Sequence, residues 1–208
     1  NNQEKNMKKR HLVYAIALIV GMGACAASAK KQAEAKPDVW KSYNVGTVLF
    51  EDKAPETKGS DIYHRIIPDA ESYIKEQART VLATLYSSPE DSITPVSKIH
   101  YTLEDIEGIS AKGGGNGDVT IFYSTRHIEK SFAENDTAKL FFETRGVLLH
   151  ELTHAYQLEP QGIGSYGTNR VFWAFIEGMA DAVRVANGGF DGPNARPKGG
   201  NYMDGYRT

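Results

Sequence analysis

The chain has 208 residues, with 24 lysine and arginine residues against 26 aspartate and glutamate residues, which gives a formal net charge of −2. This length is enough for one domain with its own hydrophobic core, because domains commonly run to about 100–150 residues. The near balance of charges argues against binding to nucleic acid or to anionic membranes that depends on a strongly basic surface.

The first 29 residues have the three parts of a secretory signal peptide. Residues 7–10 are a positively charged start, residues 12–20 are an apolar run too short to span a bilayer, and residues 27–29 are a small-x-small cleavage site. Residues 1–6 fit none of these parts. We therefore expect an exported protein, either periplasmic, at the cell surface or secreted, and cleavage would change the net charge to −5.

Cys25 is the only cysteine in the sequence, and it lies within the signal peptide. Cleavage after Ala29 would leave no thiol, so any metal in the mature protein would need nitrogen and oxygen ligands. A second interpretation stays open, in which residues 22–25 are a degenerate lipoprotein cleavage site and Cys25 becomes a lipidated N-terminus. The lipid would tether the exported protein to a membrane face, and no further transmembrane run is visible.

Residues 30–42 are predicted to form a polar linker, and residues 43–208 a single domain. Within the domain, residues 43–50 predict a β-strand and residues 51–60 a charged loop. Apolar side chains recur with helical spacing between residues 67 and 86. We expect this helix to cover one side of a sheet.

Two further segments, residues 97–103 and 118–125, are rich in β-branched and aromatic residues and predict strands. The glycine-rich residues 113–117 predict a turn between Ile109 and Val119. The expected fold is α+β, with a small and mostly antiparallel sheet, or a mixed one, packed on helices.

Two histidines, His150 and His154, stand one helical turn apart, with a glutamate beside the first. Positions i and i+4 share one face of an α-helix, so both imidazoles can reach one metal ion. Zn²⁺ accepts imidazole nitrogen, and a catalytic zinc site keeps one coordination position open for water, which requires a third protein ligand. Glu151 would act first as general base and then as general acid.

The helix with this motif is expected to begin near Asp136 or Thr137 and to extend to Leu158. It is apolar nearly all the way round near the motif, which is typical of a buried helix. Histidine and glutamate side chains buried there need partners, because an unpaired buried polar group costs several kcal/mol. Metal coordination would supply those partners.

A second apolar helix is predicted over residues 171–183, and it carries Glu177 and Asp181 on one face. Glu177 can complete a site of two histidines and one glutamate. Asp181 can accept a hydrogen bond from the free N–H of a ligand histidine and fix its tautomer. Gly178 would let the two helices approach closely, and glycines and a proline between residues 160 and 167 would let the chain double back.

This constellation resembles the gluzincin metallopeptidases, in which the paired-histidine helix precedes a second helix with the pattern Glu-x-x-x-Asp. Residues 149–157, followed by residues 175–181 and Arg184, are similar to the basic secretory protein family of plants and bacteria, a group of proposed zinc peptidases. The metzincin pattern is not met, because Gln157 and Pro160 stand where it places a glycine and a third ligand.

The resemblance is closest over residues 141–184 and looser over residues 43–131. It implies a zincin-like fold, and it departs in charge, since plant members are named for a basic character. Members of the family continue past a glycine-tyrosine stretch like that of residues 205–206. The resemblance therefore also implies that this chain is truncated at the C-terminus. In zincins the last strand before the metal helix borders the cleft, so residues 120–124 are the candidate edge for pairing with an extended substrate. The alternative is a strand that only faces the core.

Several other side chains have weaker interpretations. A tyrosine could donate to the oxyanion of a tetrahedral intermediate, although ordinary packing or a surface turn explains each candidate as well: Tyr156, Tyr166, Tyr202 and Tyr206. Arg184 could pair with Asp181, and Gln157 either supports the metal site or ends the helix. Three histidines outside the motif are expected to be surface or satisfied side chains: His64, His100 and His127.

The sequence thus predicts a zinc-dependent endopeptidase, monomeric and acting on a peptide or protein, in which His150, His154 and Glu177 hold the metal. Two alternatives stay open. The first is a catalytically silent zincin scaffold that binds partners at the cell surface, against which the intact Glu151 argues. The second is a zinc hydrolase of another amide or ester bond, such as one in the cell wall, because zinc polarises any carbonyl.

Overall fold

The structure is a computed structural model that describes residues 38–131 and 136–189. All described elements belong to the compact unit formed by residues 37–208. The predicted signal peptide, Cys25, most of the predicted linker and the C-terminal stretch from residue 190 lie outside the described residues. Within the two described ranges, no helix is both long and apolar enough to cross a membrane.

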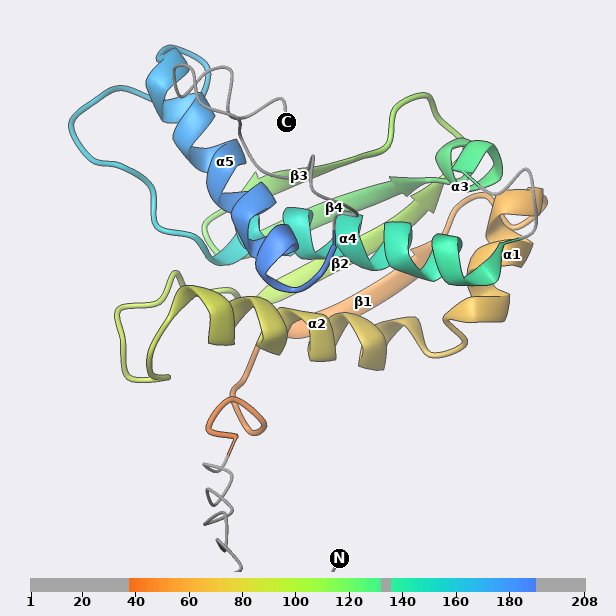
Figure 1. Ribbon diagram of the computed structural model, residues 1–208, viewed down its shortest axis with the longest axis horizontal. Helices are drawn as coiled ribbons and strands as arrows, with labels where there is room; N and C mark the ends of the chain where they lie inside the picture. The colour runs from red at the N-terminus through yellow and green to blue at the C-terminus, as the bar shows by residue number, and fades with distance from the viewer. Residues whose placement is uncertain (1–37, 132–135, 190–208) are drawn as a thin grey trace, which may run out of the picture. The chain divides into compact units, whose positions relative to one another are not determined.

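Along the described residues, one strand and two helices come first, then three strands and then three helices (Figure 1). The elements in chain order are β1 (Thr47–Asp52), α1 (Lys58–Ile66), α2 (Ala70–Leu85), β2 (Lys98–Glu104), β3 (Ser110–Gly115), β4 (Asp118–Ser124), α3 (Thr125–Ser131), α4 (Thr137–Tyr156) and α5 (Arg170–Ala186).

The four strands form one sheet in the order β1-β2-β4-β3. β1 and β2 are parallel, since α1 and α2 carry the chain back before β2 begins, and β2 and β4 are parallel as well. Only β3 and β4 pair antiparallel. The α+β class and the alternative of a mixed sheet are confirmed. The prediction of a mostly antiparallel sheet is wrong, because β4 inserts between β2 and β3 and returns parallel to β2.

The hairpin between β3 and β4 turns at Asn116 and Gly117, whose φ angles of 53° and 83° are those of a tight turn with two left-handed residues. The preceding glycines 113–115 belong to β3, so the turn is shorter than predicted. β3 is consequently an edge strand, and β4 lies inside the sheet. The prediction that residues 120–124 offer an open edge is therefore wrong.

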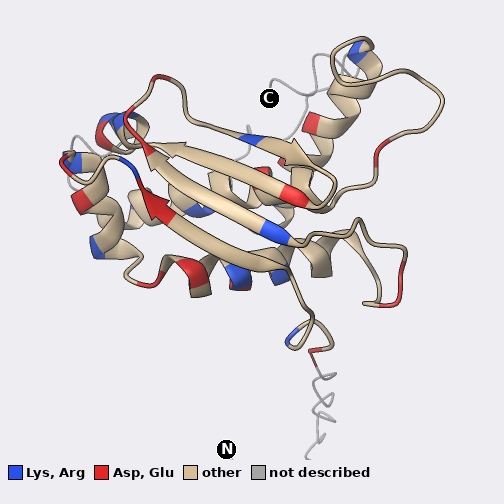
Figure 2. Cartoon of the chain, turned by 180° about the vertical axis from the view of Figure 1, so that it is seen from behind, with Lys and Arg blue, Asp and Glu red and all other residues tan. Residues whose placement is uncertain are grey.

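One face of the sheet is apolar and buried, and helices α2 and α4 lie across it (Figure 1). The six central side chains of this face are Ile99, Tyr101, Leu103, Val119, Ile121 and Tyr123, each at most 4% exposed. The opposite face carries no described helix (Figure 2) and bears cross-strand ion pairs such as Lys98–Asp118 and His100–Glu51. The hydrophobic core therefore lies on the helical side of the sheet.

Two helices occur where the sequence predicted other structure. α1 occupies the end of the predicted charged loop, and Thr57 caps it by accepting from the backbone N–H of Ser60. α3 begins at Thr125, the last residue of the strand predicted over residues 118–125, and it contains His127. Upstream of residue 43, Trp40 is 5% exposed and contacts Tyr43, so packed structure begins within the predicted linker.

α4 begins as predicted, with Asp136 as its cap, and the side chain of Asp136 accepts from the backbone N–H of Lys139. α5 packs against it, and the close approach occurs at Gly146, where a Cβ would lie 2.5 Å from Nε of Arg184. A Cβ at Gly178 would meet nothing within 4 Å. The prediction that Gly178 permits the close approach is therefore wrong.

Candidate metal centre

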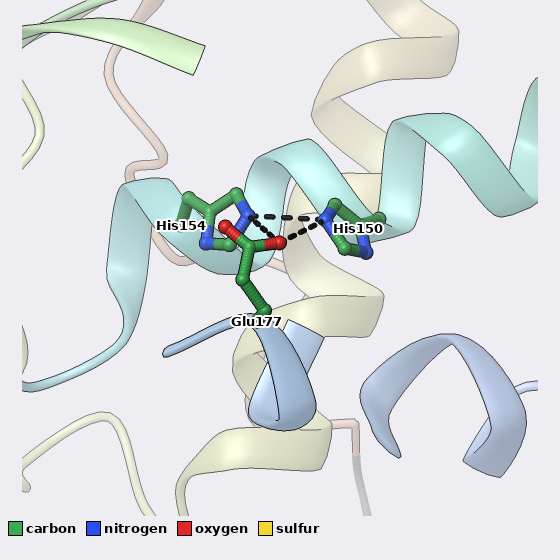
Figure 3. A group of neighbouring side chains, drawn as sticks. All are labelled: His150, His154 and Glu177. Atoms are coloured by element: carbon green, nitrogen blue, oxygen red, sulfur yellow. Dashed lines mark hydrogen bonds and ion pairs between the residues drawn. The ribbon is translucent and has the colours of Figure 1, made fainter. Parts of the chain in front are cut away.

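Three side chains from α4 and α5 direct one ligand atom each at a common point (Figure 3). Nε2 of His150 and Nε2 of His154 are 3.1 Å apart. Oε2 of Glu177 lies 3.2 Å from Nε2 of His150 and 3.6 Å from Nε2 of His154. The two helices thus bring together the three residues that the sequence selected as a ligand set.

These distances can be compared with the geometry of a four-coordinate metal. Bonds of about 2.0–2.1 Å in a tetrahedron place neighbouring ligand atoms about 3.3–3.4 Å apart. The observed separations of 3.1, 3.2 and 3.6 Å bracket this value. The cluster could therefore hold a metal ion with little movement, and its nitrogen and oxygen donors suit Zn²⁺ and related divalent cations.

The electrostatics of the cluster also favour a cation, because three carboxylates surround two imidazoles. Burial by itself would lower the pKa of His150, yet the nearby carboxylates raise it to about 9. Glu177 shows the complementary shift: burial opposes its ionisation, but hydrogen bonds from the two histidines and from Tyr166 hold its pKa far below the usual range. The site therefore carries fixed negative charge that a divalent cation would neutralise.

Each of the three side chains is also held from its far side. Nδ1 of His150 lies 2.9 Å from Oδ1 of Asp181, which leaves Nε2 directed at the cluster. Nδ1 of His154 lies 2.8 Å from the amide of Gln157, and the hydroxyl of Tyr166 donates to Oε1 of Glu177 at 2.6 Å.

The contact between His154 and Gln157 indicates which tautomer a metal would need. Gln157 is 5% exposed, and its Oε1 has no hydrogen-bond partner, while Nε2 of its amide faces Nδ1 of His154. A 180° rotation of the amide would let Oε1 accept from Nδ1–H and would leave Nε2 of His154 unprotonated. The buried amide therefore fits a metal-bound imidazole.

Glu151 lies beside the cluster and lines the same cleft. It is 7% exposed, and burial raises its pKa, opposed by the charges of the neighbouring histidines. A carboxylate in this setting can take up a proton more readily than one in water. Ser110 was not selected from the sequence, and it reaches the cleft because β3 is the edge strand.

The cleft has a volume of about 680 Å³ and runs between β3, α4 and α5. Its β3 wall consists of Ser110, Ala111 and Lys112, and apolar side chains such as Phe172 and Ile176 line the α5 side. An open strand edge beside a row of polar groups can receive an extended chain.

The remaining candidates from the sequence have structural contacts. Tyr156 is buried and donates to the backbone carbonyl of Val45 at 2.7 Å, so it cannot face the cleft. Arg184 donates to Oε2 of Glu143 at 2.8 Å. His127 contacts Oε1 of the same carboxylate at 3.0 Å. Tyr202 and Tyr206 lie outside the described residues.

The two other histidines are satisfied on the surface, as expected. Nε2 of His64 lies 3.0 Å from Oδ2 of Asp52, and Nε2 of His100 lies 2.9 Å from Oε2 of Glu51. Neither histidine lines the cleft that contains the cluster.

A family model described as a peptidase of plants and bacteria matches residues 45–208, which is most of the chain. Comparisons with curated proteins and with solved structures give no match. The matched range contains both helices of the cluster, and the description agrees with the resemblance carried by residues 149–157 and 175–181. The chain therefore belongs to the basic secretory protein family, the peptidases of plants and bacteria.

Proposed function

We propose that the protein is an exported, zincin-like, zinc-dependent endopeptidase whose metal ligands are His150, His154 and Glu177. The observation that carries the proposal is the convergence of Nε2, Nε2 and Oε2 at separations of 3.1–3.6 Å, beside the carboxylate of Glu151. Family membership supports peptide hydrolysis, and the signal-like residues 1–29 support export. Asp181 orients His150 through Nδ1.

A bound Zn²⁺ would polarise the scissile carbonyl and lower the pKa of a water molecule. Glu151 would take the proton from that water, since its carboxylate lines the same cleft as the three proposed ligands. Its raised pKa suits it to hold this proton and then to deliver it to the leaving amine. Burial of Glu151 and the apolar α5 wall keep bulk water from competing for that proton.

The edge strand β3 supports a polypeptide as the substrate. Ser110 lines the same cleft as Glu151 and the three proposed ligands, so the start of β3 lies beside the proposed reacting groups. An extended peptide pairing with this edge would place consecutive carbonyl groups along the cleft. The strand that performs this role is β3, whereas the sequence had indicated residues 120–124.

Replacing Glu151 separates metal binding from hydrolysis. Glu151→Gln keeps the size of the side chain, so we expect about one zinc per chain, as in the wild type, with hydrolysis of a peptide library reduced by at least about 10²-fold. His150→Ala should lose both the zinc and the hydrolysis. Metal content is measured by plasma mass spectrometry and cleavage by mass spectrometry of the library.

The same experiment discriminates between the proposed function and its alternatives. A wild-type protein that retains zinc but cleaves no peptide would support a silent scaffold, or a hydrolase of another bond if it cleaves amide or ester substrates instead. Undiminished cleavage by Glu151→Gln would remove Glu151 from the proposed role. A wild-type protein that takes up no zinc would refute the metal centre itself.

A further inference from the structure

The loop between α4 and α5 reaches the metal cluster through Tyr166. Residues 158–168 of this loop are exposed apart from the partly buried Pro160, and Gly162 and Gly164 adopt left-handed φ angles of 79° and 92°. Tyr166 is 49% exposed, yet its hydroxyl donates to Oε1 of Glu177 at 2.6 Å. A loop side chain thus contacts a proposed metal ligand directly.

The two oxygens of Glu177 have different partners. Oε2 faces both histidine nitrogens, whereas Oε1 accepts from Tyr166. A carboxylate can bind a metal through one oxygen or through both. A hydroxyl that occupies Oε1 at 2.6 Å leaves Oε2 as the available ligand atom.

The hydroxyl of Tyr166 is itself oriented. Trp173 lies one turn before Glu177 on α5 and hydrogen-bonds with this hydroxyl. An indole N–H can only donate, so the hydroxyl accepts from Trp173 and directs its own proton at Glu177.

We propose that Tyr166 is a positioning residue, which restricts Glu177 to one-oxygen metal binding and joins the α4–α5 loop to the metal centre through the same hydrogen bond. This inference rests on the proposed function, since it takes Glu177 as a metal ligand. The hydrogen bond between Tyr166 and Glu177 links the α4–α5 loop to the proposed metal ligand. Metal binding therefore stabilises the loop conformation, and the loop conformation in turn strengthens metal binding. The sequence suggested a different role, donation to an oxyanion, for which the hydroxyl would have to leave Oε1.

Tyr166→Phe removes the hydroxyl and keeps the ring. We expect Zn²⁺ affinity, measured by competition with a chromophoric chelator, to fall by about 10- to 100-fold, as is usual when the partner of a metal ligand is lost. Trp173→Phe should act in the same direction with a smaller change. Tyr73→Phe is the matched control, because the hydroxyl of Tyr73 is buried on α2 without a hydrogen-bond partner, and it should leave the affinity unchanged.

Two further readouts separate positioning from general stability. The visible spectrum of the Co²⁺-loaded protein reports coordination number, so a Glu177 freed to use both oxygens should weaken the absorption in Tyr166→Phe but not in Tyr73→Phe. Hydrogen exchange of residues 158–169 should slow on addition of Zn²⁺ in the wild type and remain unchanged in Tyr166→Phe.

The possible outcomes separate this inference from the proposed function. Equal Zn²⁺ affinity and equal Co²⁺ spectra in the wild type and Tyr166→Phe would overturn the positioning role and leave the metal centre intact. Reduced peptide turnover in Tyr166→Phe with unchanged affinity would instead favour the oxyanion role. A wild type that binds neither Zn²⁺ nor Co²⁺ would overturn both the proposed function and this inference.

Discussion

Gly146 and Gly178 allow a direct test of how α4 and α5 are packed. Both glycines lie inside helices, so replacing either with alanine should gain about 1 kcal/mol of helix stability. The surroundings differ, because a Cβ at Gly146 would lie 2.5 Å from Nε and 2.8 Å from Cζ of Arg184, whereas a Cβ at Gly178 has no neighbour within 4 Å. The structure therefore predicts opposite signs for two chemically identical substitutions.

The cost at Gly146 follows from the contacts of Arg184. The new Cβ would be about 1 Å too close to Nε for ordinary packing. The guanidinium cannot simply move away, because it is 9% exposed and donates to the carbonyl of Gly189 and to Glu143, each at 2.8 Å. A hydrogen bond to a charged group contributes about 1.5–3 kcal/mol. If one of these hydrogen bonds is lost, subtracting the helix gain leaves Gly146→Ala with a free energy of unfolding lower by about 0.5–2 kcal/mol.

Urea denaturation of the metal-free protein, followed by far-ultraviolet circular dichroism, would measure both variants at an unchanged m value. Gly178→Ala should be as stable as the wild type or more stable, by up to about 1 kcal/mol. A Gly146→Ala protein as stable as Gly178→Ala would show that Arg184 is not confined against α4, and the packing argument would fail.

Two further predictions concern pH and metal. Hydrogen bonding with His127 and the charge of Arg184 lower the pKa of Glu143 in the folded protein. This carboxylate therefore stabilises the fold at pH values above its ordinary pKa of 4.5, and the stabilisation is lost as the pH falls through the lower pKa of the folded state. Glu143→Gln should therefore flatten the loss of stability between about pH 5 and 3, measured by denaturant midpoints, and a slope equal to that of the wild type would contradict the assignment. Free Zn²⁺ at about 100-fold above its dissociation constant should stabilise the fold by about 2.7 kcal/mol, which raises the melting temperature by about 5–10 °C over the chelated protein. Identical melting curves with Zn²⁺ and with chelator would mean that the native state binds no metal.

Most residues of the candidate site could be predicted from the sequence, because they were identified by their helical spacing. The i and i+4 separations of His150 with His154, and of Glu177 with Asp181, place each pair on one helix face whatever the rest of the fold does. The packing of α4 against α5 could also be predicted from the sequence, because both helices are apolar and residues that break helices separate them. The side chains that support the ligands were harder to assign, because Tyr166 and Gln157 act through contacts that only the packed loop and helix end create.

The sheet shows where local information was insufficient. Strand positions followed from β-branched and aromatic residues, but the order β1-β2-β4-β3 depends on which strand fills the gap beside β2. The glycines 113–115 have low strand propensity, and they are strand residues because β4 supplies their hydrogen-bond partners. Their assignment to a turn also led to the wrong edge strand.

The amino-acid sequence by itself determined the proposed ligand set, the two helices that carry it and the α+β class, because these depend on residue chemistry and on periodicity along one element. The tertiary structure decided which strand borders the cleft, which glycine allows the helices to approach, and which side chains orient the proposed ligands. Those features depend on the approach of segments far apart in the chain, such as Gly146 to Arg184 and Ser110 of β3 to the cleft lined by Glu151, and the short-range sequence pattern carries no information about them.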